Sequence, residues 1–326
     1  MFAGSPTARQ FAALRIALPG DYGRGRFYLG PTWGLREIVR VASPSGYRIV
    51  KLANGAHSIH SLAHHETFHP VIGPVAEAEA LYVNQLRLVE RLSHHQGEFV
   101  IWDVGLGGAA NAVTFLQAIQ DVRSSIHLLS FDHTLEPLEF ALHHTAALGY
   151  LEGYEMHLRR LLEERRVVFE EGRRAVRWEV HVADFPGLLS QPAARRLAKP
   201  HGIMFDAFSP AKNPAMWTLP LFVNLFRLLD PGRACALPTY SRSTMLRVTL
   251  LLAGFFVGAG HASGEKEETT IAANTLELIE EPLGKRWLER ASRSTSAEPL
   301  TEPVYRQAPL APETKERLKQ HPQFSS

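Results

Sequence analysis

The sequence has almost no cysteine: Cys235 is the only one in 326 residues. A single cysteine excludes an intramolecular disulfide framework and is typical of a reducing compartment. It lies in the apolar run RACALP. We therefore expect a buried thiol in the core rather than a catalytic nucleophile.

Long apolar runs are also lacking. The longest, VTLLLAGFFVGAG after Arg247, is shorter than the roughly 20 residues that a membrane-spanning helix needs. The first twenty residues, MFAGSPTARQFAALRIALPG, do not show the basic-then-apolar order of a secretion signal. We expect a soluble cytoplasmic protein that does not enter a membrane.

A large excess of charge of one sign is absent. There are 35 Lys and Arg residues against 33 Asp and Glu, which gives a net charge of +2 with the sixteen histidines neutral. This balance does not indicate a strongly basic nucleic-acid binder, although a local basic face is compatible with it. The densest basic stretches, RRLLEERR and GRRAVR between residues 159 and 177, are predicted to be a solvated helix face and a hairpin. They are also the first candidates for an RNA-binding surface.

Metal-ligand spacing is lacking as well. Histidines occur as adjacent pairs at residues 64–65, 94–95 and 143–144, and adjacent residues do not share the face of a helix that a chelating pair needs. We predict no metal site.

Strands and helices alternate from residue 98 onward. The apolar runs EFVIWDVG, SIHLLSFD, HGIMFDAF and RACALPTY are each followed by a segment with helical apolar spacing. This alternation predicts an α/β fold with a Rossmann-like, doubly wound and mostly parallel sheet. The segments FFVGAGHAS and KEETTIAAN predict a closing hairpin, and therefore an antiparallel last strand, while VVFEEGRRAVRWEVHVADF predicts a hairpin that turns at Glu171-Gly172.

Shorter elements precede this domain. RIVKL-ANG-AHSIHSL predicts a hairpin around Asn54-Gly55, and Pro74 suits the start of a helix. The predicted organisation is a loosely ordered segment (1–28), a hairpin and helix extension (29–96), the doubly wound domain (97–280), and a C-terminal helix with a mobile tail (281–326).

A glycine-rich turn, DVGLGGAAN, spans residues 103–111 between the first strand and its helix. Glycines in such a turn let the backbone approach a ligand, and the helix N-terminus favours polar or anionic groups. The stretch also fits G-x-G-x-x-A, a weak dinucleotide signature on its own. Asp132, which ends the next strand, is placed to accept hydrogen bonds from ribose hydroxyls. These features fit a nicotinamide or an adenosyl cofactor equally well, and tight packing alone is a third interpretation.

Asp184 ends another strand in HVADF. An acid at this position can meet the amino group of adenine, or it can cap the helix that follows. The sequence alone leaves both interpretations open.

The stretch FDAFSPAKNPAMW places Asp206 at the carboxyl end of a strand, where open α/β sheets bind their ligands. Pro210 and Pro214 restrict the loop, so the acid and Lys212-Asn213 are preorganised. Trp217 begins the following helix and fits either a stacking platform or the core.

This stretch resembles the signature of the MnmC/MnmD-type tRNA methyltransferases, Asp-Gly-Phe-(Ala/Ser)-Pro-x-(Lys/Arg)-Asn-Pro-x-(Met/Leu)-Trp. Residues 206–217 match it at nearly every place. DVGLGGAAN is similar to the family's E-x-G-F-G-T-G-x-N turn, and the acids at 132 and 184 also have counterparts. The upstream ETFHPVIGPVAEAEALYV and the late TYSRSTMLRVTLLLAGFFVGAG extend the resemblance to about residues 55–272.

The resemblance implies a class I S-adenosylmethionine-dependent methyltransferase. Its substrate would be the aminomethyl group of wobble 5-aminomethyl-2-thiouridine in tRNA. The implied cofactor-binding residues are Asp103, Gly105, Leu106, Gly107, Gly108, Asn111, Asp132, His133, Asp184 and Phe185. Asp103, Gly105, Gly107 and Asn111 would line the methionine end and the ribose of the cofactor. Asp132 would bind the ribose hydroxyls, and Asp184 with Phe185 would bind the adenine.

The resemblance also implies a catalytic role for Asp206, which would hold the substrate amine by a hydrogen bond and receive its proton. Lys212 would meet a tRNA phosphate, and Trp217 would shape the pocket for an unstacked wobble base. The implied substrate-binding residues are Glu66, His69, Glu77, Lys212, Asn213 and Trp217.

Four positions depart from the family pattern. Asp103 replaces a glutamate, Ala109 ends the usual Gly-Thr-Gly, Ala207 replaces a glycine, and Ala215 replaces a common acid. They keep open a methyltransferase of the same fold with another amine substrate. A NAD-dependent oxidoreductase and a catalytically silent adenosyl-binding protein also stay open. Because the chain ends at residue 326, without room for the oxidase domain of bifunctional members, we expect the stand-alone type.

Overall fold

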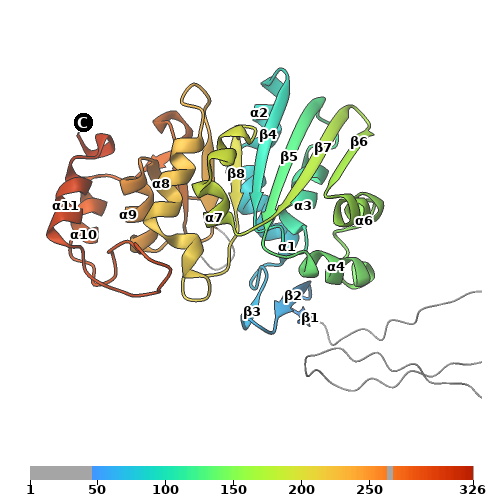
Figure 1. Ribbon diagram of the computed structural model, residues 1–326, viewed down its shortest axis with the longest axis horizontal. Coiled ribbons are helices and arrows are strands. Elements are labelled where there is room, and N and C mark those ends of the chain that lie inside the picture. Colours follow the sequence, from blue (N-terminus) through green and yellow to red (C-terminus); the bar gives the residue numbers. More distant parts are fainter. Residues whose placement is uncertain (1–45, 263–266, 326) are drawn as a thin grey trace, which may run out of the picture. The chain divides into compact units, whose positions relative to one another are not determined.

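A nine-stranded sheet forms the centre of the structure, a computed structural model that describes residues 46–262 and 267–325 (Figure 1). The predicted loosely ordered segment 1–28, and the predicted extension up to residue 45, lie outside the described residues. The strand order is β12-β10-β11-β9-β8-β4-β5-β7-β6. In chain order the strands are β4 (Glu98–Val104), β5 (Ser124–Asp132), β6 (Arg166–Glu171), β7 (Arg174–Val182), β8 (Gly202–Phe205), β9 (Ala236–Thr239), β10 (Phe256–Gly260), β11 (Thr269–Ala273) and β12 (Glu281–Pro282).

The middle of the sheet is parallel. β4 pairs in parallel with both β5 and β8, and these pair in parallel with β7 and β9. β11 runs antiparallel between β9 and β10, and β6 forms the predicted hairpin with β7. The predicted Rossmann-like doubly wound sheet with an antiparallel last strand is therefore confirmed.

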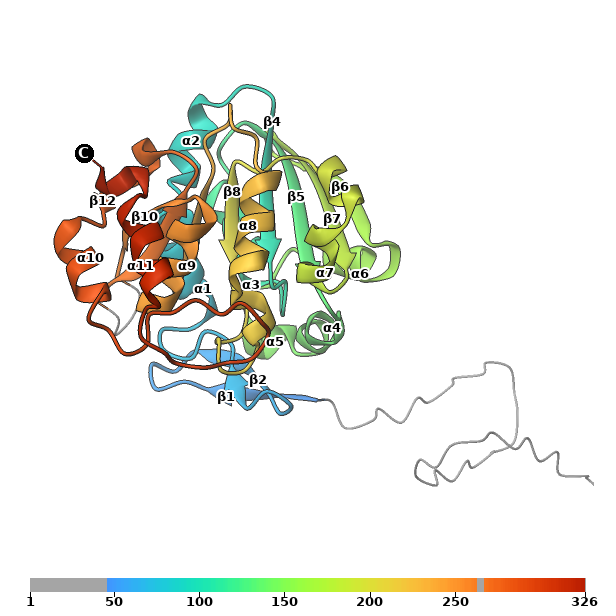
Figure 2. The same cartoon turned by 60° about the vertical axis from the view of Figure 1, so that its left-hand side comes forward.

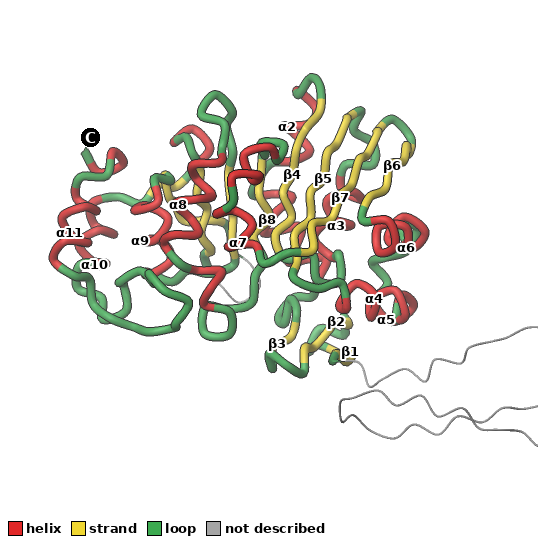
Figure 3. The backbone as a smooth tube through the Cα atoms, in the orientation of Figure 1, coloured by secondary structure: helices red, strands yellow, loops and turns green. Residues whose placement is uncertain are grey.

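Helices cover both faces of the sheet (Figures 1 and 3). α7 and α8 lie on one face and α2 and α3 on the other. The helices and short helical turns are α1 (Pro74–Ala78), η1 (Glu79–Asn84), α2 (Leu88–His94), α3 (Ala110–Ala118), α4 (Glu136–His143), α5 (Thr145–Leu148), α6 (Glu155–Glu164), α7 (Phe185–Ser190), η2 (Pro192–Arg196), η3 (Pro214–Trp217), α8 (Leu219–Leu228), α9 (Thr244–Ala253), η4 (Leu276–Leu278), α10 (Lys285–Ala291), α11 (Pro312–Lys319) and η5 (Pro322–Phe324).

β4 shows why the sheet needs cover on both sides. Phe99 and Ile101 belong to one hydrophobic cluster, together with residues of α1 to α6. Val100, Trp102 and Val104 belong to a second cluster, with residues of α7 to α9. Because successive side chains of a strand point to opposite faces, this uninterrupted apolar run is stable only when both faces are buried.

A small three-stranded sheet precedes the large one. β1 (Tyr47–Lys51) and β2 (His57–Ser61) pair antiparallel, and β3 (Glu66–Thr67) pairs with β2. Gly55 has the positive φ of 90° that the turn requires, and the side-chain amide of Asn54 donates to the carbonyl of Ile72 at 3.0 Å. The predicted hairpin around Asn54-Gly55 is confirmed.

The predicted helix starts at Pro74 but is interrupted. α1 continues into the wider turns of η1, and the chain then breaks at Arg87, whose φ is 49°, before α2. Leu86 and Leu88 on either side of the break are both buried. Residues two apart do not face the same side of a continuous helix, so the break at Arg87 lets both leucines reach the core.

The C-terminal residues, for which the sequence predicts a mobile tail, pack onto the domain instead. Leu318 of α11 and Phe324 are buried in the second cluster, and α11 lies against α9 (Figure 2). The side chain of Gln323 accepts from the amide of Val257 at 2.8 Å and donates to its carbonyl at 2.7 Å. Docking by two apolar anchors and these hydrogen bonds to β10 orders an end that its composition alone suggests is loose.

Within the described ranges, no helix is long and apolar enough to cross a membrane.

We predict that Leu318→Ala destabilises the folded protein by about 2–5 kcal/mol, because it leaves a cavity where α11 docks. The free energy of unfolding from urea denaturation measures this. Met156→Ala is the matched control, since Met156 is 77% exposed on α6 and its loss should change stability by about 0.5 kcal/mol at most. Equal effects of the two substitutions would contradict the docking of α11.

Candidate functional site

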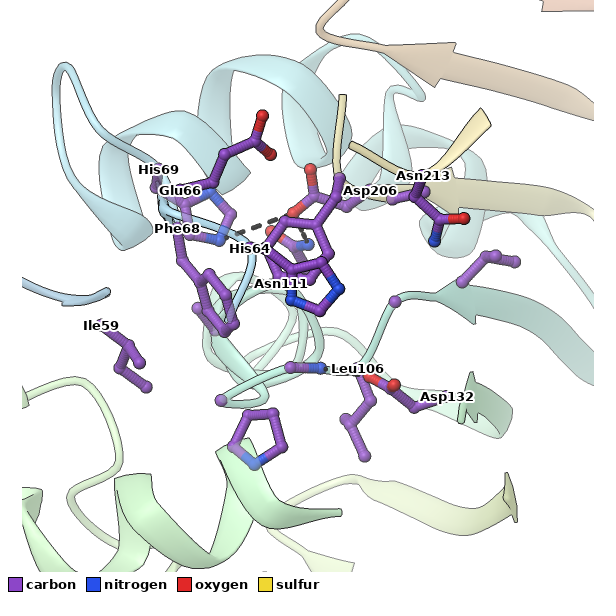
Figure 4. Close-up of a pocket in the computed structure, with 18 of the residues that line it drawn as sticks. Ile59, His64, Glu66, Phe68, His69, Leu106, Asn111, Asp132, Asp206 and Asn213 are labelled. Carbon is purple, nitrogen blue, oxygen red and sulfur yellow. Dashed lines mark hydrogen bonds and ion pairs between the residues drawn. The ribbon is translucent and has the colours of Figure 1, made fainter. Parts of the chain in front are cut away.

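A cavity of about 730 Å³ opens beyond the carboxyl ends of β4, β5 and β8 (Figure 4). The strand order reverses here, because β4 is flanked by β5 on one side and β8 on the other. Open α/β sheets bind ligands at this switch point, and the volume is typical of a site for a small molecule or cofactor. The glycine turn after β4, the loop after β8 and the small N-terminal sheet all contribute to its walls.

The turn after β4 packs directly on the loop after β8. Gly105 has a φ of +95°, and a Cβ atom placed on it would lie 2.5 Å from the carbonyl oxygen of Asp206. Only glycine tolerates both the dihedral angle and the contact. The close approach holds the two motifs found in the sequence at one side of the same cavity.

Asp132, at the end of β5, fixes the other side of the glycine turn. Its Oδ2 accepts a hydrogen bond from the amide of Gly107 at 2.9 Å, and its Oδ1 accepts from the amide of His133 at 2.8 Å. The imidazole of His133 also donates a hydrogen bond to the Asp132 carboxylate, which raises the pKa of this imidazole. Asp132 lines the cavity, as do Leu106, Gly107, Gly108 and His133.

Asp103 lies beneath the turn and does not line the cavity. Its Oδ2 accepts from the hydroxyl of Ser130 at 2.7 Å, and that hydroxyl accepts from Nε1 of Trp178 at 2.9 Å. Burial raises the pKa of the Asp103 carboxyl to about 7. The prediction that Asp103 contacts a cofactor is therefore not supported, and its position is that of a buried support for the turn.

Asp184 caps the following helix, as one of the two interpretations from the sequence predicts. Its Oδ2 accepts from the amide of Gly187 at 3.0 Å, so it caps α7. It also lines the cavity next to Phe185.

Asp206 projects into the cavity and is surrounded by polar partners (Figure 4). The side-chain amide of Asn111 donates to Oδ2 of Asp206 at 2.8 Å, and Nε2 of His69 lies 3.6 Å from the same oxygen. Nδ1 of His69 lies 3.8 Å from Oε2 of Glu77. The structure thus brings together four predicted site residues that are distant in the sequence.

Two buried tyrosines, Tyr82 and Tyr240, feel the negative charge of Asp206. Tyr82 donates to the carbonyl of Phe205 at 3.0 Å, and Tyr240 donates to that of Ala207 at 3.0 Å. Burial, and after it the negative charge of Asp206, raises the pKa of both tyrosines well above its ordinary value. An acidic site of this kind favours a cationic or strongly hydrogen-bond-donating ligand.

Glu66 on β3 connects the small sheet to the loop after β8. Its carboxylate accepts from the amide of Ser209 at 3.2 Å and from the hydroxyl of the same serine. The amides of Lys212 and Asn213 both donate to the carbonyl of Ser209, so the loop closes into a turn whose residues line the cavity. Glu66 therefore positions this loop.

Trp217 does not line the cavity. Its side chain is fully buried, its Nε1 donates to the carbonyl of Phe208 at 2.7 Å, and its ring packs edge-on against Phe205 and Tyr240. The full burial of the indole supports the core interpretation over a stacking platform. The indole serves as the packing base under the loop.

Sequence reasoning misses an aromatic rim at the cavity. His64 stacks on Phe208 with ring centroids 4.2 Å apart, and Phe68 contacts Phe208 edge-on at 5.5 Å. In the sequence His64 stands out only as half of an adjacent histidine pair. For Phe68, Phe208 and Tyr240, the available signal is their place within the stretches that match the family pattern.

The structure also bears on the predictions about Cys235 and about metal binding. Cys235 is buried, and burial raises the pKa of its thiol to about 12, which confirms the predicted core thiol. In the part of the chain that the structure describes, no group of three or more His, Cys, Asp or Glu side chains is arranged to hold a metal ion.

Residues 152–275 match a family model described as S-adenosyl-L-methionine-dependent methyltransferase. This match supports the predicted methyltransferase class and S-adenosylmethionine as its cofactor, and it disfavours the nicotinamide interpretation.

Curated relatives include the tRNA 5-methylaminomethyl-2-thiouridine biosynthesis bifunctional protein MnmC of Aeromonas hydrophila. It is 30% identical over 212 residues, which are 60% of this chain and 30% of the relative. The protein of the same name from Methylibium petroleiphilum is 27% identical over 71% of this chain and 35% of its own length. The chain thus spans about a third of the length of these relatives.

A similar solved structure is MnmC2 from Aquifex aeolicus, with a TM-score of 0.61 and 24% identity over 85% of this chain and 84% of that one. This likeness concerns the fold. Together with the sequence relatives, it confirms the predicted resemblance to the MnmC-type methyltransferases.

We predict that Gly105→Ala weakens binding of S-adenosylhomocysteine at least about tenfold and destabilises the protein by about 3 kcal/mol, because the new methyl group collides with the Asp206 backbone. Gly153→Ala is the matched control: Gly153 also has a positive φ, +85°, but no atom lies within 4 Å of a Cβ placed there. It should cost about 1 kcal/mol and keep full affinity. Calorimetric titration and urea denaturation of both variants measure the difference, and equal losses of affinity would refute the contact.

We also predict a pH-dependent gain in stability for Asp103→Asn. The folded-state pKa of about 7 lies above the ordinary carboxyl value, so this group contributes stability at low pH that is lost as the pH rises from about 4 through 7. Asparagine cannot ionise, so the stability of the variant relative to wild type should rise over this range by an amount on the order of 4 kcal/mol at most. Urea denaturation of ligand-free protein between pH 5 and pH 8 tests this. A difference that does not change with pH would contradict the raised pKa.

Proposed function

We propose that this protein transfers a methyl group from S-adenosylmethionine to the aminomethyl group of 5-aminomethyl-2-thiouridine at the wobble position of tRNA. The observation that carries the proposal is the position of Asp206. Its carboxylate stands inside the cavity where the glycine turn meets the loop after β8, and His69 lies between it and the second acid, Glu77. In this proposal residues 97–280 are the methyltransferase domain, the preceding elements cover its site, and the enzyme works in the cytoplasm, where it meets tRNA.

The cavity suits an adenosyl cofactor. Gly105 and Gly107 line the cavity and have no side chain, which leaves bare backbone facing it. Oδ1 of Asn111 is buried and has no hydrogen-bond partner among the described residues, as expected for an atom that awaits a polar ligand. Asp132 keeps spare lone pairs for ribose hydroxyls, and Phe185 offers an apolar surface for adenine. When bound, S-adenosylmethionine supplies the methyl group on an electrophilic sulfonium.

The residues around Asp206 prepare the acceptor. Methyl transfer to nitrogen needs a neutral amine with its lone pair directed at the methyl group. Asn111 holds Oδ2 of Asp206, whereas Oδ1 accepts no hydrogen bond from any described residue. Oδ1 is therefore the oxygen that receives a hydrogen bond from the substrate amine, and it fixes the nitrogen at one place in the cavity.

The rim of the cavity suits an RNA base. A wobble base must leave its stack to reach a methyl donor inside the protein, and enzymes hold such bases between flat side chains. The stacked rings of His64 and Phe208 provide such a surface, and Lys212 on the adjoining loop provides a cation for a phosphate. The relatives whose names refer to tRNA biosynthesis support the same substrate.

A different amine is the second candidate substrate. Ala207 and Ala215, where the resembled family has glycine and an acid, both line the cavity. A change of two cavity-lining residues alters its shape and charge, which is how related enzymes acquire different acceptors.

The proposal is tested with labelled S-adenosylmethionine and tRNA from cells that lack the final methylation, followed by mass spectrometry of the nucleosides. We expect label on 5-methylaminomethyl-2-thiouridine. Asp206→Asn should lower the rate by about 10² or more while S-adenosylhomocysteine still binds, because the amide cannot accept the proton. Asp121→Asn, an exposed substitution just before β5 and outside the cavity, should keep full activity. Label on no wobble uridine, with label on a small amine, would favour the second candidate.

A further inference from the structure

His69 lies between two carboxylates. Its Nε2 is 3.6 Å from Oδ2 of Asp206, and its Nδ1 is 3.8 Å from Oε2 of Glu77. The side chains of His69 and Glu77 are only 8% and 9% exposed, against 19% for Asp206. All three line the same cavity, and Asp206 is the most exposed of them. The imidazole therefore stands between two carboxylates.

The backbone at His69 is held in an uncommon conformation. Its φ is 48°, in the left-handed region that costs a residue with a side chain about 1–2 kcal/mol. The neighbouring contacts fix it, since the amide of Phe68 donates to Ile59 at 2.8 Å and Glu66 holds Ser209. Such strain is concentrated at functional sites, and here it directs the imidazole at Asp206.

We propose that His69 accepts, through Asp206, the proton that the substrate ammonium must lose before methylation. The inference rests on the proposed function and adds a residue that acts behind the acceptor-holding carboxylate. Oε2 of Glu77 lies 3.8 Å from Nδ1, and a proton on Nδ1 leaves the lone pair of Nε2 facing Asp206.

The chemistry balances without a further reactant. One N–H bond of the ammonium breaks and its proton forms an O–H bond with Oδ1 of Asp206. Rotation of the carboxyl group then presents this proton to Nε2 of His69, which takes it as the O–H bond breaks. The neutral amine then forms the N–C bond while the C–S bond of the sulfonium breaks and its electron pair remains on sulfur. The product is a protonated secondary amine, and the proton on His69 returns to solvent when the product leaves.

A carboxylate alone is a poor acceptor for this proton. A carboxylic acid is ordinarily a much stronger acid than an alkylammonium, while imidazolium lies between the two. Passing the proton to an imidazole therefore reduces the free-energy cost of forming the neutral amine.

The charged groups nearest the imidazole are two carboxylates. Oδ2 of Asp206 lies 3.6 Å from Nε2, and Oε2 of Glu77 lies 3.8 Å from Nδ1. The other titratable side chains that line the cavity are Tyr47, His64, His65, Glu66, Asp132, His133, Tyr150, Asp184, Lys212 and Tyr240.

The kinetic test compares His69→Gln with the wild type across pH. At pH 7 the variant should methylate tRNA about 10²-fold more slowly. The deficit should shrink by about tenfold per pH unit as the pH approaches the pKa of the amine itself, because the amine then needs no acceptor. The affinity for S-adenosylhomocysteine should not change. His143→Gln, an exposed histidine on α4, is the control and should behave as wild type. A loss that is the same at every pH would show a merely structural role and overturn the proposal.

If the wild type does not methylate the wobble uridine at all, the proposed function fails, whereas normal wild-type activity with a wild-type pH profile in His69→Gln sinks only the relay.

Discussion

The close packing of Gly105 against the backbone of Asp206 is the contact on which the site depends. It holds the turn after β4 and the loop after β8 together at the switch point of the sheet. Asn111, in the first turn of the helix that follows (α3), thereby reaches the carboxylate of Asp206 with its side-chain amide at 2.8 Å. Parallel strands buried on both faces give the two segments a rigid base, so the distance between cofactor turn and acceptor carboxylate is set by the sheet rather than by loop motion.

The small N-terminal sheet completes the site from the opposite side. Glu66 of this sheet accepts a hydrogen bond from Ser209. The residues that follow place His69 beside Asp206, and Glu77 lies beside His69. Two carboxylates flank one imidazole, and no Lys or Arg of the described chain forms an ion pair with Asp206. In the proposed function, the ammonium group of the substrate would supply that positive partner and would lose its proton to the same cluster.

Periodicity predicted the sheet, its antiparallel last strand and the hairpin, because a strand buried on both faces and an Asn-Gly turn leave strong local patterns. The motifs also located the cavity. Local pattern could not decide which side chains face it: Asp103 and Trp217 belong to matched stretches, yet one pairs with Ser130 under the turn and the other packs beneath the loop. The docked C-terminus and the His69 cluster depend on contacts between distant residues, which no local spacing encodes.

The most direct test is a crystal structure of the protein with S-adenosylhomocysteine and an anticodon stem-loop carrying 5-aminomethyl-2-thiouridine. The account predicts that the aminomethyl nitrogen lies within hydrogen-bond distance of Oδ1 of Asp206, with the adenosyl group between the glycine turn and Phe185. An amine bound away from Asp206, or a cofactor outside the cavity, would contradict it.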